Sequence, residues 1–70
     1  MKSITIEEAA DLLGKHKVAG IKTIKCVNQV FHNNIWTLDG IALTNGQYVG
    51  LAAEGDCVQY WLVEPEDIKE

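Results

Sequence analysis

The sequence predicts an α+β fold in which a short N-terminal helix packs on a four-stranded antiparallel β-meander. Two observations predict this class. Residues 5–8 carry a helix-capping pattern, and from Val18 onward β-rich runs alternate with residues typical of tight turns. A chain of 70 residues with 47 % apolar side chains has room for one hydrophobic core, so residues 1–70 are expected to form a single domain.

The helix is predicted over about residues 6–14. Thr5 and Glu8 have the spacing of a capping box, in which each side chain bonds the backbone N–H of the other residue. Apolar residues then recur at helical spacing at Ile6, Ala9, Ala10 and Leu13. Gly14 suits the left-handed residue that often ends a helix.

The strands are predicted over about residues 20–32, 35–44, 47–54 and 57–63. Three residue pairs have the composition of two-residue hairpin turns: Asn33 with Asn34, Asn45 with Gly46, and Gly55 with Asp56. The only proline, Pro65, ends the last strand, and residues 65–68 are expected to form one helical turn. The chain therefore contains three successive hairpins after its helix.

These turns define a register, and the register divides the apolar side chains between the two faces of the sheet. The first face would hold Val27, Phe31, Trp36, Leu38, Ala42, Val49, Leu51, Ala53, Val58, Tyr60 and Leu62. The second face would hold Ile24, Cys26, Val30, Ile35, Ile41, Leu43, Tyr48, Trp61 and Val63. A three-residue turn in place of the first hairpin would exchange the assignments of the first strand.

Both faces are thus predicted to be apolar, whereas one short helix can cover only one of them. The second face can be covered in three ways: the sheet curls into a small barrel, two copies pack together, or another protein docks. Residues 60–68, YWLVEPEDI, resemble the final strand and turn of SH3-like barrels. That resemblance implies closure of the sheet as the way to bury the second face within one chain.

Part of the second face has the composition of a protein-binding surface. Tryptophan and tyrosine among aliphatic side chains are typical of interface hot spots. We therefore predict partner binding at Ile41, Leu43, Tyr48, Trp61 and Val63. The predicted function is that of a small non-catalytic interaction module, a regulator or inhibitor that binds another protein or forms a homodimer through this face.

Nucleic-acid binding is the first alternative, and the charge distribution opposes it. The net charge is −4, the chain has no arginine, and residues 26–70 carry seven acidic residues against one lysine. Four lysines gather between residues 15 and 25, at Lys15, Lys17, Lys22 and Lys25. Their commoner role is to protect a sheet edge from pairing, so we expect nucleic acid to be an unlikely partner.

A small enzyme or metal protein is the second alternative. His16, His32, Cys26 and Cys57 are zinc-ligand types, but none of their spacings matches a zinc knuckle, so no metal, cofactor or catalytic residue is predicted. Both cysteines are expected to be small buried groups, either free or, in a closed barrel, joined in a disulfide. Two cysteines and no long apolar run favour a cytoplasmic protein without a membrane span.

Overall fold

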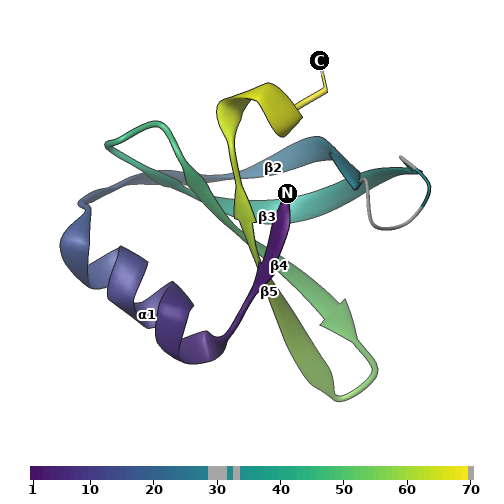
Figure 1. Ribbon diagram of the computed structural model, residues 1–70, viewed down its shortest axis with the longest axis horizontal. Helices are drawn as coiled ribbons and strands as arrows, with labels where there is room; N and C mark the ends of the chain where they lie inside the picture. Colours follow the sequence, from purple (N-terminus) through teal and green to yellow (C-terminus); the bar gives the residue numbers. More distant parts are fainter. Residues whose placement is uncertain (29–31, 33, 70) are drawn as a thin grey trace.

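The computed structural model describes residues 1–28, 32 and 34–69 and shows one helix packed on an antiparallel sheet (Figure 1). The α+β class is therefore confirmed, but the sheet has five strands rather than four. Its elements, in chain order, are β1 (Lys2–Ile4), α1 (Ile6–Lys15), β2 (Val18–Asn28), β3 (Asn34–Leu43), β4 (Tyr48–Glu54), β5 (Cys57–Val63) and the 3-10 turn η2 (Pro65–Asp67). The strand order in the sheet is β1-β5-β4-β3-β2.

The additional strand, β1, pairs with the outer edge of β5, where Ser3 lies opposite Trp61. Three residues are too few to show an alternating pattern, which is why the sequence did not reveal it. The capping box of α1 forms as predicted, with the Glu8 N–H and the Thr5 hydroxyl oxygen 3.1 Å apart. The helix does not end at Gly14, however, because Lys15 remains helical and His16 is the extended capping residue.

The hairpin between β4 and β5 has the predicted register. Gly55 has a φ of +60°, and Trp61 pairs with Gly50 across the ladder. The turn between β3 and β4 lies at the predicted place but contains three residues rather than two. Gly46 has a φ of +93°, and the N–H of Leu43 donates to the carbonyl of Gln47. This is the usual geometry of a three-residue hairpin loop with a glycine bulge.

The longer turn shifts the β3–β4 register by one residue. The side chains of β3 therefore lie on the faces opposite to those predicted. Ile41 pairs with Val49, and Ala42 pairs with Tyr48, where Leu43 was predicted to lie opposite Tyr48. The first hairpin differs as well, since Asn28 pairs with Asn34 and the expected turn at Asn33 lies partly outside the described residues. The predicted positions of Val30 and Phe31 also lie outside them.

Each face of the sheet carries its own core. The helix side buries one cluster made of Ile4, Ala9, Leu43 and Val49. The other side buries a second cluster made of Ile24, Cys26, Leu38, Trp61 and Val63. The expectation of two apolar faces is therefore correct in its outline, and the chain covers the second face itself.

Both chain ends help to cover this second face. Met1 and Ile68 pack against the second cluster, and the Lys69 N–H donates to the Lys25 carbonyl at 2.7 Å. A single bridge joins Cys26 to Ile68, while β1 and β2 remain the edges of the described sheet. The C-terminal segment thus lies along part of the β2 edge without adding a full strand there.

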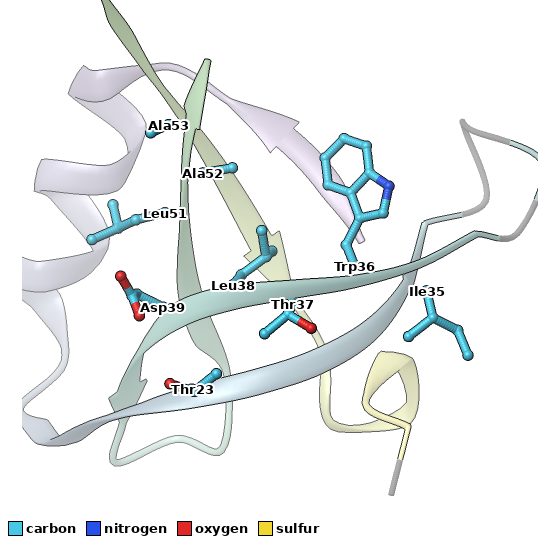
Figure 2. A pocket seen from close by; sticks show the side chains of 9 residues that line it. All are labelled: Thr23, Ile35, Trp36, Thr37, Leu38, Asp39, Leu51, Ala52 and Ala53. Atoms are coloured by element: carbon cyan, nitrogen blue, oxygen red, sulfur yellow. The ribbon is translucent and has the colours of Figure 1, made fainter. Parts of the chain in front are cut away.

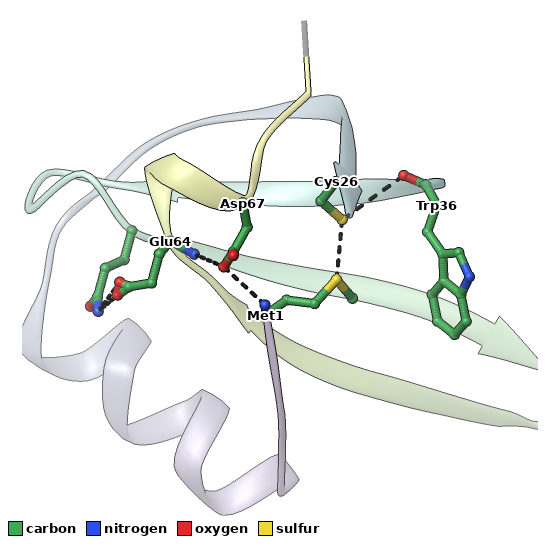
Figure 3. A network of polar contacts seen from close by, with 6 residues as sticks. Met1, Cys26, Trp36, Glu64 and Asp67 are labelled. Atoms are coloured by element: carbon green, nitrogen blue, oxygen red, sulfur yellow. Dashed lines mark hydrogen bonds and ion pairs between the residues drawn. The ribbon is translucent and has the colours of Figure 1, made fainter. Parts of the chain in front are cut away.

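Polar contacts hold the chain ends in place (Figure 3). The Met1 amino group forms an ion pair with Asp67 at 3.0 Å, and Asp67 accepts the N–H of Glu64. The Cys26 thiol lies 3.3 Å from the Met1 sulfur, and burial raises the pKa of this thiol. Both cysteines are free, but only Cys26 is buried, so the prediction that Cys57 is buried is wrong.

Candidate binding groove

The residues predicted to bind a partner do not lie on one surface. Tyr48, Trp61 and Val63 share the face of the second core, whereas Ile41 and Leu43 face the helix side, because β3 is inverted relative to the prediction. Trp61 is 4 % exposed, Leu43 3 % and Val63 0 %. The binding role of these five residues stays a prediction, and the exposed patch that motivated it is not present.

A hollow of the described surface lies elsewhere, where β3 and β4 separate. Pairing between these strands begins at the turn and ends at Asp39 and Leu51. Beyond that pair, β3 continues with β2 alone and β4 continues with β5 alone. The two hairpins therefore point in different directions, as Figure 1 shows, and a groove of about 540 Å³ opens between them.

Three strands contribute to this groove, which we call the β3–β4 groove. It is lined by residues 35–39 of β3, residues 51–53 of β4 and Thr23 of β2 (Figure 2). Figure 2 shows Trp36 and Leu38 projecting from one side of β3, with Ile35 and Thr37 projecting from the other. Leu38 is buried, whereas Ile35 is 55 % exposed at the outer end of the groove.

A pair of glycines lies directly beside the point at which the strands separate. Gly40 and Gly50 face each other across β3 and β4. A Cβ atom on Gly40 would lie 2.9 Å from Cδ1 of Ile24, and one on Gly50 would lie 3.1 Å from Cδ1 of Leu38. Core side chains thus occupy the space above both glycines, so a larger residue at either position would collide with the second core.

In the part of the chain that the structure describes, the groove has one charged side chain in its lining, the exposed carboxylate of Asp39. It lies at the closed end of the groove beside Leu51, as Figure 2 shows. The remaining lining is aliphatic, aromatic or hydroxylated. Such a surface can hold an apolar segment and orient it by charge, but it offers no paired acid and base for chemistry.

A second hollow lies toward the β1 edge of the sheet, formed by Ile4, Ile6 and residues 57–60. It contains the exposed thiol of Cys57 and the half-exposed side chain of Val58. Within the described residues, no group of three or more histidine, cysteine or acidic side chains is placed to hold a metal ion. In the same part of the chain, no helix is long and apolar enough to cross a membrane.

The lysines of the alternative nucleic-acid site are also dispersed. Lys15 forms an ion pair with Asp11 at 2.9 Å on the helix surface. Lys22 lies over the Tyr48 ring, with its Nζ 5.3 Å from the ring centroid. Because residues of opposite parity face opposite ways in a strand, Lys25 lies on the other face of β2.

The comparisons with known proteins point to no function. The chain matches no protein-family model, and no curated protein or solved structure is significantly similar to it. A functional argument for this chain therefore rests on the geometry of its surface.

Proposed function

We propose that this chain is a small non-catalytic interaction module that regulates or inhibits another protein by binding it at the β3–β4 groove. The observation that carries the proposal is the separation of β3 and β4, which leaves a hollow lined by six apolar residues together with Thr23, Thr37 and Asp39. Exposed apolar residues around a concavity are typical of protein-binding surfaces. The two free thiols fit the cytoplasmic setting that we propose for it.

The groove supports this role better than the face predicted from the sequence, because three of its β3 residues, Ile35, Thr37 and Asp39, are exposed without unfolding a core. Ile35 is more than half exposed, whereas Trp61 and Val63 are buried against neighbouring strands. Homodimerisation through the second face would first have to remove Met1 and the C-terminal segment that cover it. Nucleic-acid binding has less support, since Lys22 and Lys25 lie on opposite faces of the strand.

The test is a comparison of two matched surface variants in affinity capture from the native host. Ile35→Glu places a charge in the groove, whereas Ile21→Glu places the same charge at a position that is 72 % exposed and outside the groove. The two positions are about 20 Å apart along the hairpin, because Ile35 pairs with Val27, six residues from Ile21.

We expect wild type and Ile21→Glu to capture the same protein and Ile35→Glu to lose it, with all three giving the same circular dichroism. Burying an uncompensated carboxylate in an interface opposes binding strongly. Equal capture by both variants, or loss in both, would show that the groove is not the binding site.

A further inference from the structure

We infer that the occupant of the β3–β4 groove is an extended, basic segment of the partner protein, which adds to β3 as a new strand. This inference rests on the proposed function and specifies the chemistry of the partner. It is carried by the direction of main-chain groups in β3 and by the charge at the closed end of the groove.

The hydrogen bonds of the neighbouring turn establish which β3 groups face the groove. In an antiparallel sheet, successive residues direct their N–H and C=O groups to alternate sides of the strand. The N–H of Leu43 donates to the Gln47 carbonyl toward β4, whereas the N–H of Thr44 donates to the Lys17 carbonyl toward β2. Odd-numbered residues of β3 therefore direct their main-chain groups toward β4.

The same alternation continues along β3 past the point where β4 departs. Asp39 still pairs with Leu51, but the next odd-numbered residues, Thr37 and Ile35, have no strand paired with them on that side in the described part of the chain. On the opposite wall of the groove, Ala53 of β4 is the residue that would lie opposite Thr37 if the β3–β4 register continued. An extended segment entering the groove would find donors and acceptors at strand spacing, as in recognition by β-strand addition.

The outer edge of β2 offers an internal check on this alternation. Odd-numbered residues of β2 should direct their main-chain groups outward, and the Lys25 carbonyl does accept the Lys69 N–H there at 2.7 Å. The C-terminal segment thus already uses one β2 edge position in the way that we infer for a partner at β3. By the same alternation, the N–H of Ile21 is directed toward the outer edge of β2 and lies outside the groove.

Charge determines which extended segments fit. Among the described residues, Asp39 is the only charged side chain that lines the groove, and it lies at the closed end where β3 and β4 meet. Residues 26–70, which include both walls, carry seven acidic residues against one lysine. A segment with apolar side chains and a lysine or arginine at the end nearest Asp39 is complementary to this surface.

The test uses the full chain labelled with nitrogen-15 and three synthetic peptides of about nine residues, which is within the usual range of strand lengths. The first alternates valine and threonine and has lysine at both ends. The second has glutamate in place of lysine, and the third is the lysine peptide with alternate amides N-methylated. Binding is followed by chemical shifts and by amide hydrogen exchange at up to about 1 mM peptide.

We expect the lysine peptide to bind with protection of the Thr37 and Ile35 amides and no change at Ile21. The glutamate peptide should bind roughly fivefold more weakly, because an exposed ion pair at Asp39 becomes a repulsion. N-methylation should weaken binding about tenfold, because it removes main-chain donors. Asp39→Lys should remove the preference for lysine, whereas Glu66→Lys, an equal charge change at an exposed site outside the groove, should preserve it.

Four results would overturn the inference. Equal binding of the methylated peptide would mean that side chains alone are recognised. Shifts centred on Ile4 and Ile6 would locate the occupant in the second hollow. Protection of Thr37 that rises with protein concentration in the absence of peptide would identify a second copy as the occupant. If no peptide binds although capture depends on Ile35, the proposed function stands and the extended basic partner is wrong.

Discussion

Substituting Gly40 by alanine tests the packing at the base of the groove. The added Cβ would lie 2.9 Å from Cδ1, 3.1 Å from Cγ1 and 3.3 Å from Cγ2 of Ile24. Three atoms of one side chain are thus too close, and Ile24 is only 3 % exposed, so it has no open space into which to rotate. Overpacking of this kind costs about 1–3 kcal/mol.

A smaller effect of opposite sign reduces this cost. Replacing glycine by alanine restricts the unfolded chain and stabilises the fold by about 0.4–1 kcal/mol where the backbone permits it. We therefore expect Gly40→Ala to lower the free energy of unfolding by about 1–2 kcal/mol. For a domain of this size that is a decrease in Tm of roughly 5–15 °C.

The assay is urea unfolding followed by tryptophan fluorescence, with Gly20→Ala as the matched control. Gly20 also lies in a strand, but a Cβ there meets nothing within 4 Å, so this variant should be neutral or slightly more stable. Ile24→Val removes the atom at 2.9 Å. It should cost about 0.5–1.5 kcal/mol alone, yet restore part of the stability of Gly40→Ala. Strict additivity of the two substitutions, or a Gly40→Ala variant as stable as wild type, would refute the packing argument.

Two further predictions concern the helix start and the buried thiol. Thr5→Ala removes the acceptor for the Glu8 N–H and should cost about 1 kcal/mol in thermal unfolding, whereas Thr5→Ser should cost less because it keeps the hydroxyl. The pKa of Cys26 is raised above its ordinary value of 9.0, so the folded thiol stays protonated while the unfolded thiol ionises. Stability should then decline above about pH 9 with a slope that Cys26→Ala reduces, and iodoacetamide at pH 8 should alkylate the exposed Cys57 first.

The sequence predicted the elements of this fold better than it predicted their pairing. The helix and the four longer strands lie within a few residues of their predicted bounds, because capping and alternation are local signals. The register around Gly55 and Asp56 was also correct, since a two-residue turn permits one pairing only. The turn at Asn45 and Gly46 could not be resolved in this way, because Asn-Gly is compatible with both a two-residue and a three-residue loop.

The additional residue in the β3–β4 turn explains why the predicted binding residues do not share one face. A shift of one residue in the β3–β4 turn exchanges the two faces of β3. The prediction placed Ile41 and Leu43 on the face of Trp61, whereas the structure places them on the helix side. The first hairpin contains a second odd-numbered shift, which returns Ile24 and Cys26 to the predicted face. The sequence therefore predicted correctly that both faces are apolar, but it placed the side chains of β3 on the wrong faces.

The groove could not have been predicted from the alternation of apolar and polar residues. It forms where β3 and β4 stop pairing, and that pattern does not show where pairing between two strands ends. Gly40 and Gly50 are the only local signal, since each lacks a side chain beside the last β3–β4 pair. Ile24 and Leu38 fill the space above these glycines and close the second core. These glycines also lie beside the last β3–β4 pair, so we expect the stability of this core and the shape of the groove to depend on one packing arrangement. A substitution at Gly40 should accordingly change peptide binding at Thr37 as well as the free energy of unfolding, although its side chain does not line the groove.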